Sequence, residues 1–368
     1  MTETLLVLLI TSVSCAIIGC FLVLRKLSMV SDAISHSVLL GIVIAFFITR
    51  DLSSIWLIFG AAIFGVITVL SIEWLSYGGL VKKDDAVGIV FPFFFALAVI
   101  LISMFARNTH LDTDIVLMGN VIFTSLNRYN FGTFTIAKSL LNMSIMLGIN
   151  ISFITIFFKE LKLTTFDEEF ATVSGFSSVL LFYSLMTLSS MTSVIAFDAV
   201  GAILVISLLI SPGATAYLLT KDLKITILLS ALIAIINALI GFHLAIWLDG
   251  SIGGMCAFIG GISFLLAFLL NKDGLITTTI RKIKRKIQFK EELLIVHIGN
   301  HRQSYKESDE LGFKTIAKHL NWQDQQFNSI SKKLLKKKII FKDNNKNIFD
   351  LTEKGIKSFE NLRDMYGI

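Results

Sequence analysis

Residues 24–47 read LRKLSMVSDAISHSVLLGIVIAFF, and this stretch decides the fold. A long apolar run follows a short basic turn, as expected at the start of a membrane-spanning helix. Within it, Asp32 and His36 are four residues apart, so a helix places their carboxylate and imidazole on one face. Ionisable groups inside a membrane segment are costly, and they usually mark transport, proton relay or ligand binding.

The Asp32–His36 pair has two interpretations on sequence grounds. Carboxylate oxygen and imidazole nitrogen are ligands that suit divalent first-row transition metals. In the structural alternative, Ser31 caps the helix, Asp32 complements the helix dipole and His36 is a hydrogen-bonding partner between helices. The two residues alone leave both interpretations open.

The rest of the chain is equally apolar. Hydrophobic residues make up 54% of its 368 positions, too many for an ordinary soluble protein. Runs of about 18 or more apolar residues predict membrane-spanning helices. The candidates are 5–24, 32–49, 54–75, 86–105, 136–158, 177–196, 199–219, 225–247 and 252–270. We therefore expect an all-α polytopic membrane protein with about nine membrane helices, the seventh being a candidate for a break because it holds Gly201, Pro212 and Gly213.

The basic residues indicate how these helices cross the membrane. Loops on alternate sides differ in Lys and Arg, and the richer side is expected to be cytoplasmic. That side carries Arg25, Lys26, Lys82, Lys83, Lys159, Lys162, Lys221 and Lys224. The opposite loops carry Arg50, Arg107, Arg128 and Lys138. This arrangement predicts an outer N-terminus and a cytoplasmic segment after residue 271, in the inner (cytoplasmic) membrane.

The composition changes sharply at residues 281–286, RKIKRK. Residues 281–368 contain 20 Lys and Arg against 11 Asp and Glu, a net charge of +9. We expect a transmembrane domain at 1–272, a basic juxtamembrane linker at 273–288 that can lie on anionic lipid, and a small cytoplasmic domain at 289–368.

An acidic, amphipathic segment lies between two spans at residues 160–175. Glu169, Ala171 and Gly175 have the E-x-A-x-x-x-G spacing of the loop by which importer permeases dock onto their ATPase subunits, and Asp167 and Glu168 precede them. Small residues let a short helix sit in a cleft, and glycine permits a tight turn at its end. The alternative is a plain connecting loop.

Five stretches together resemble the permease subunit of the ABC-type manganese/zinc/iron importers, the ABC-3 family. They occur in family order and read FLVLRKLSMVSDAISHSVLLGIVIAF, DDAVGIVFPFFFALAVILIS, LDTDIVLMGN, FDEEFATVSGF and VGAILVISLLISPGATAYLLT. The resemblance implies a homodimeric permease for Mn, Zn or Fe ions rather than an enzyme. It also implies an extracytoplasmic metal-binding protein and a separate ATPase subunit, and the sequence contains no G-x-x-x-x-G-K-[ST] phosphate loop.

The resemblance also assigns roles to individual residues. Asp32 and His36 match the family's Asp and His, which implies a place on the metal path. His110, Asp112 and Asp114 are candidates for metal entry on the outer side. The alternative for these three is a solvated loop in which Asp112 or Asp114 caps the following helix.

The basic tail resembles the winged-helix DNA-binding domain of the iron-dependent (diphtheria-toxin-type) repressors, with IAKHL at 316–320 and LTEKG at 351–355. Lysines on its third expected helix form a basic face suited to nucleic-acid phosphates, namely Lys332, Lys333, Lys336 and Lys337. A solvated lysine face on a domain that does not bind nucleic acid is equally compatible. One small core is expected from Leu293, Leu294, Val296, Ile316, Leu320, Ile330, Leu334, Ile339 and Ile340.

Two other functions remain open on sequence grounds. The first is a membrane-tethered winged-helix transcription regulator whose spans serve as an anchor or sensor. The second is a secondary metal transporter that works without ATP, which the spacing of the docking loop disfavours.

Overall fold

The computed structural model describes residues 2–51, 54, 56–105, 128–131, 134–272 and 274–367. The chain divides into two compact units, Met1–Asn271 and Lys272–Ile368. We call them the membrane unit and the tail unit and describe each by itself.

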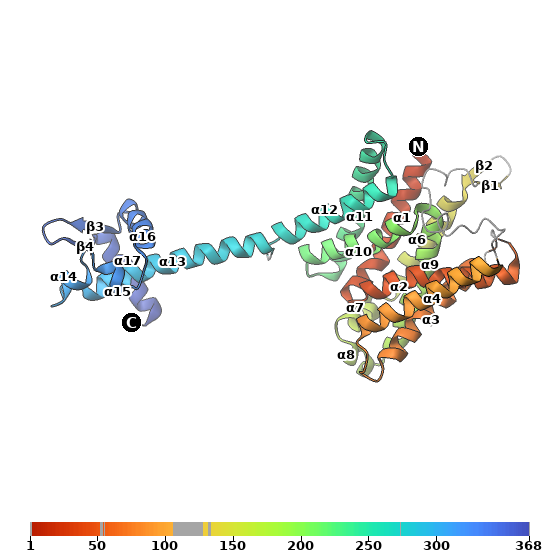
Figure 1. Cartoon of the computed structure of the whole chain (residues 1–368), viewed down its shortest axis with the longest axis horizontal. Coiled ribbons are helices and arrows are strands. Elements are labelled where there is room, and N and C mark those ends of the chain that lie inside the picture. The colour runs from red at the N-terminus through yellow and green to blue at the C-terminus, as the bar shows by residue number, and fades with distance from the viewer. Residues whose placement is uncertain are drawn as a thin grey trace. The chain divides into compact units, whose positions relative to one another are not determined.

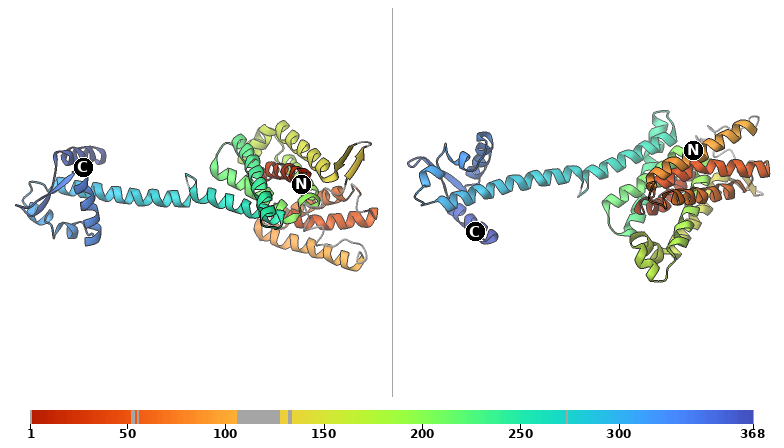
Figure 2. Two further views of the ribbon diagram at one scale, coloured as in Figure 1. Left: turned by 90° about the horizontal axis from the view of Figure 1, so that it is seen from above. Right: turned by 60° about the horizontal axis from the view of Figure 1, so that its bottom comes forward.

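The membrane unit is built almost entirely of helices (Figure 1). They are α1 (Thr2–Leu24), α2 (Ser28–Thr49), α3 (Trp56–Ser76), α4 (Lys83–Phe105), α6 (Lys138–Ile156), α7 (Phe158–Phe166), α8 (Glu168–Val173), α9 (Ser178–Val200), α10 (Ala202–Leu219), α11 (Leu223–Trp247) and α12 (Ile252–Leu270). A short antiparallel hairpin, β1 (Arg128–Phe131) and β2 (Phe134–Ala137), directly precedes α6 and extends from its first turn (Figure 2).

The prediction of about nine membrane helices is confirmed, since nine helical segments of the described chain are long and apolar enough to span a bilayer. The break expected in the seventh span lies at its start. Gly201 has φ +85° and separates α9 from α10, whereas Pro212 lies inside a continuous α10. Glycine adopts this left-handed backbone without the steric cost that a side chain would add.

Helix α1 is the centre of the membrane unit and packs against α6, α9, α10 and α11. Helices α2, α3 and α4 pack side by side (Figures 1 and 2). The tightest crossings depend on glycine. A Cβ on Gly19 of α1 would lie 1.8 Å from the backbone oxygen of Leu209, and one on Gly41 of α2 would lie 2.3 Å from that of Gly60. Small residues at such crossings let membrane helices approach closely where no hydrophobic effect drives association.

Two of the basic residues predicted to share one side of the membrane contact the same helix, α7. Arg25, in the turn between α1 and α2, donates hydrogen bonds to Thr164 and Thr165 of α7. The Lys224 ammonium at the start of α11 lies 5.6 Å from the ring centre of Phe158, the first residue of α7. These contacts place α7 beside the start of α2.

The tail unit begins with a long helix, α13 (Leu275–His301), which includes most of the expected linker at 273–288. It continues with α14 (Glu307–Glu310), α15 (Ile316–His319), α16 (Asp324–Lys336), the antiparallel hairpin β3 (Ile340–Asp343) and β4 (Ile348–Leu351), and α17 (Glu353–Tyr366). An additional β-bridge joins Gly312 to Ile348.

A single apolar core holds the tail unit together. It includes Leu294, Ile298, Ile316, Leu334 and Ile340, each at most 2% exposed. The prediction that Leu293 belongs to the core is wrong. Helix α13 turns Leu294, Ile295 and Ile298 inward and leaves Leu293 37% exposed.

Candidate functional site

The structure brings Asp32 and His36 together on α2. The Asp32 Oδ1 and His36 Nε2 atoms are 3.6 Å apart, and the two side chains are 39% and 30% exposed. Two donors bound at about 2.1 Å to one tetrahedral metal ion lie roughly 3.4 Å apart. The pair is therefore spaced for one cation and remains accessible to it.

The surroundings of the pair weaken the capping alternative. Helix α2 begins at Ser28, after Leu27, so Ser31 lies inside the helix and does not cap it. The imidazole of His36 instead packs against aromatic rings of α4, with its centroid 5.5 Å from that of Phe91 and 6.1 Å from that of Phe95. These rings fix the imidazole on the same side of α2 as the carboxylate.

The pair alone does not complete a metal site. Within the described part of the chain, no third His, Cys, Asp or Glu joins Asp32 and His36 in a cluster able to hold an ion.

A buried polar cluster, which the sequence analysis did not identify, joins three membrane helices. The Asn150 side-chain amide of α6 donates hydrogen bonds of 3.0 Å to Ser14 of α1 and of 3.0 Å to Thr192 of α9. On α9, the buried hydroxyls of Ser189 and Ser193 have no hydrogen-bond partner among the described residues. The only sequence signal was the hydroxyl-rich stretch SSMTS at 189–193 inside a predicted span.

The expected entry residues His110, Asp112 and Asp114 lie outside the described residues. Their role stays a prediction from the sequence.

The acidic segment forms a short, well-capped helix. The Asp167 carboxylate accepts a 2.9 Å hydrogen bond from the Phe170 amide at the start of α8. At the other end Gly175 adopts φ +87°, and the Gly175 and Phe176 amides donate to the Thr172 and Ala171 carbonyls. This pair of hydrogen bonds is the Schellman motif, which ends a helix at a left-handed residue.

The two faces of α8 differ in exposure. Ala171 is fully buried, which fixes the helix against the rest of the membrane unit. Glu168 and Glu169 are exposed. Three apolar side chains on and next to the helix are exposed as well: Phe166, Phe170 and Val173. Phe170 and Val173 are three residues apart on α8 and share one side of it, whereas Phe166 ends α7 before the extended residue Asp167, so α8 presents apolar side chains beside carboxylates.

The lysine face of the tail is partly used inside the domain. Lys333 and Lys337 of α16 each lie 2.5 Å from a carboxylate oxygen of Glu291 on α13. Burial raises the pKa of the Glu291 carboxyl, but the hydrogen bonds from the two lysines outweigh burial and keep that pKa below its ordinary value. Lys332 and Lys336 are exposed. Two of the four expected nucleic-acid contacts therefore have a structural role.

In comparisons with known proteins, a family model and individual relatives both match the chain. The model of the ABC 3 transport family matches residues 1–271. The zinc transport system membrane protein TroD of Treponema pallidum is 41% identical over 321 residues, covering 87% of this chain and 88% of TroD. The manganese transport system membrane protein MntD of Bacillus subtilis is 41% identical over 276 residues, covering 74% of this chain and 93% of MntD.

A solved structure also matches. PsaBC from Streptococcus pneumoniae in complex with Fab contains a chain that superposes with a TM-score of 0.63 at 28% identity, covering 77% of this chain and 94% of that one. The match to TroD spans 321 residues, more than the 271 of the family model, so it extends into the tail unit.

Proposed function

The chain belongs to the ABC 3 transport family, and we propose that it is the membrane permease subunit of an ATP-driven importer of a divalent transition-metal ion: manganese, zinc or iron. The observation that carries the metal assignment is the Asp32–His36 pair, 3.6 Å apart on a membrane helix and accessible to a cation. Similarity to zinc and manganese transport membrane proteins supports the same substrate class.

Two ligands per chain suit transport better than storage. A transported ion has to be released, so it is bound by few protein ligands and keeps part of its hydration shell. A closed site with four protein ligands holds its metal as a structural element. We propose that the remaining ligands are water and the Asp32–His36 pair of a second copy of the chain, which makes the working permease a homodimer.

Energy enters through a separate ATPase subunit. The proposed docking site is α8, because its apolar side chains Phe170 and Val173 are exposed beside Glu168 and Glu169. Phe166, at the end of α7 just before it in the chain, is exposed as well. An exposed apolar surface next to charged groups is typical of an interaction site. Ala171 and Gly175 fix the position and end of the helix, as described above.

The proposed orientation follows from the basic residues. The end of the membrane unit that carries Arg25 and α7 faces the cytoplasm, and the tail unit follows on the same side. An extracytoplasmic metal-binding protein delivers the ion at the opposite end, where His110, Asp112 and Asp114 are the proposed entry residues.

The tail unit is proposed to be a winged-helix domain. The three expected helices fall on the end of α13, on α15 and on α16, the β3–β4 hairpin follows them, and a single β-bridge pairs Gly312 with Ile348. Its use as a transcription regulator is not favoured, because Lys333 and Lys337 are paired with Glu291. The α8 surface likewise favours an ATPase-driven importer over a secondary transporter.

Uptake by cells tests the function. Cells that lack the chain and cells that express it are supplied with radioactive manganese, zinc or iron, and their metal content is measured element by element. We expect ATP-dependent accumulation of one of the three ions in the expressing cells. Equal uptake of all three ions in both kinds of cell would refute the proposal.

A further inference from the structure

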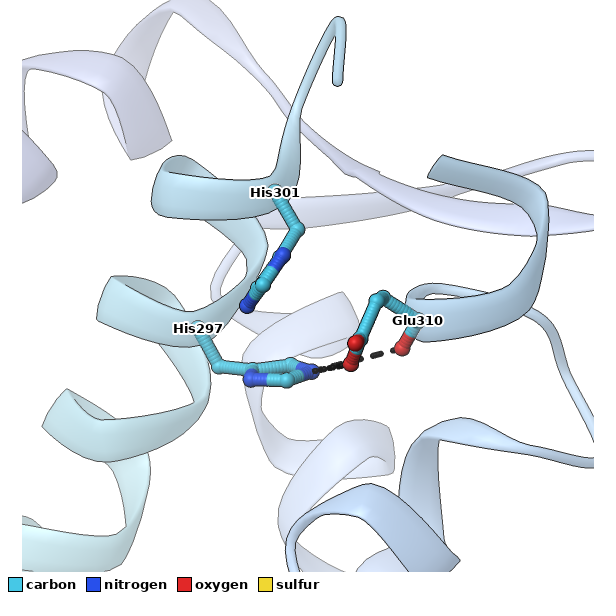
Figure 3. Close-up of side chains that lie close together, drawn as sticks. All are labelled: His297, His301 and Glu310. Atoms are coloured by element: carbon cyan, nitrogen blue, oxygen red, sulfur yellow. Dashed lines mark hydrogen bonds and ion pairs between the residues drawn. The ribbon is translucent and has the colours of Figure 1, made fainter. Parts of the chain in front are cut away.

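A second group of metal-ligand side chains lies in the tail unit (Figure 3). His297 and His301 are four residues apart on α13, and Glu310 is the last residue of α14. One ligand atom from each of the three lies within 4.8 Å of the others. Among the described residues, this is the one group of three His, Cys, Asp or Glu side chains close enough to hold an ion.

The distances show how these side chains face one another. The His297 Nε2 atom lies 3.3 Å from the Glu310 backbone oxygen and 3.9 Å from the Glu310 Oε2 atom. The imidazole rings of His297 and His301 have centroids 4.8 Å apart. Figure 3 shows all three side chains pointing into the space between α13 and α14.

A fourth donor borders the same carboxylate. His319, the last residue of α15, places Nδ1 3.1 Å from Glu310 Oε2. The group therefore contains three imidazoles and one carboxylate, and these come from three separate helices. This is the donor set of many zinc sites, and imidazole with carboxylate also accepts iron and manganese.

The environment suits a bound ion as well. The side chains of His297 and Glu310 are 13% and 18% exposed, so the site is sheltered while water and ions can still reach it. Ligand atoms on one tetrahedral ion lie roughly 3.4 Å apart, so the ligand atoms of His297, His301 and Glu310, which lie within 4.8 Å of one another, need to close by at most roughly 1.4 Å.

We propose that His297, His301 and Glu310 bind a divalent transition-metal ion in the tail unit, with His319 as the fourth ligand. Such an ion would join α13 to α14 and α15 and close the exposed loop at residues 302–306 between them. The site is separate from Asp32 and His36, so it does not depend on the transport path. It rests on the proposed function only in that the transported metal is the expected occupant, which would make the tail responsive to that metal.

The experiment uses the purified full-length chain in detergent with Zn²⁺ and Co²⁺ as probes. In a chain carrying Asp32→Asn and His36→Gln, we expect one tightly bound Zn²⁺ per chain by equilibrium dialysis. Bound Co²⁺ should show the visible absorption of a tetrahedral nitrogen- and oxygen-ligated ion. Adding His301→Gln and Glu310→Gln should remove this ion, whereas the control His243→Gln, on α11, should keep it.

Proteolysis gives a second measurement that does not depend on counting bound ions. Zn²⁺ should slow tryptic cleavage after Lys306 in the closed loop at least several-fold, and His301→Gln should abolish this protection. The proposal is overturned if Asp32→Asn/His36→Gln leaves a folded chain without bound Zn²⁺, or if the ion survives His301→Gln/Glu310→Gln. If expressing cells show no metal uptake although the tail binds its ion, the transport assignment alone fails. If uptake occurs although the tail binds no ion, the proposal of a tail metal site alone fails.

Discussion

Replacing Gly175 by valine tests whether the capped form of α8 is what the ATPase subunit requires. Gly175 has φ +87°, and a Cβ built there meets no atom within 4 Å. A Cβ therefore meets no steric obstacle at this position, and the effect of Gly175→Val is expected to come from the backbone conformation. A left-handed backbone costs a residue with a side chain about 1–2 kcal/mol, and β-branched residues tolerate it poorly. This cost opposes the two hydrogen bonds that end α8.

A cost of about 1–2 kcal/mol lowers the ratio of capped to uncapped α8 by roughly 5- to 30-fold. We expect Gly175→Val to reduce metal uptake and co-purification with the proposed ATPase subunit by up to that factor, at normal membrane insertion. Gly175→Asn is the matched control, because asparagine also adds a side chain but tolerates the left-handed region, and it should retain most of the uptake. Equal activity of both variants, or equal loss in both, would contradict the argument from backbone conformation.

The other predictions concern the metal pair and the tail. Asp32→Asn and His36→Ala should each abolish uptake at normal expression and assembly, because Asn keeps the size of the side chain but removes its charge and Ala removes the imidazole donor. Normal transport rates in both variants would make the pair structural. A chain ending at Lys272 should retain uptake, since the family match ends at residue 271, and lost uptake in a stably inserted truncation would give the tail a required role. Glu291→Gln should loosen the contact of α13 with α16, seen as faster hydrogen–deuterium exchange in α16 of the full-length chain. Because the pKa of Glu291 is depressed in the folded tail, its stabilising contribution is present above the ordinary glutamate pKa and is lost as the pH falls through the lower, folded value. The exchange rate in α16 is first corrected for the intrinsic pH dependence of exchange. A corrected rate that stays constant across this acid range would contradict the stabilising role of Glu291.

The membrane unit followed closely from the sequence. Hydropathy fixes the spans because the bilayer selects for length and apolar content, and the observed helices differ from the predicted ranges by a few residues at their ends. Contacts between residues close in sequence were equally predictable. Asp32 and His36 meet because a helix brings residues four apart together, and the same rule applies to His297 and His301.

Contacts between distant residues were not predictable. Asn150 finds its partners on α1 and α9, and no local pattern in the sequence pairs them. Glu291 forms ion pairs with Lys333 and Lys337, which are more than 40 positions away in the sequence. An interpretation of the lysine face one helix at a time therefore misses them. Glu310 completes the histidine group only after the chain has turned back at residues 302–306.

The position of Arg25 has a mechanical consequence. Its guanidinium holds Thr164 and Thr165 of α7 through two hydrogen bonds of 2.6 and 3.1 Å. Hydrogen bonds to a charged group contribute about 1.5–3 kcal/mol each, so a displacement of α7 either overcomes both or carries the turn at residues 25–27 with it. Helix α2 starts at the next residue, and Asp32 lies about 6 Å further along its axis. Movement at α7, the helix directly before the proposed docking helix α8, thus has a route to Asp32, a proposed metal ligand, that consists of two hydrogen bonds and a single helical turn.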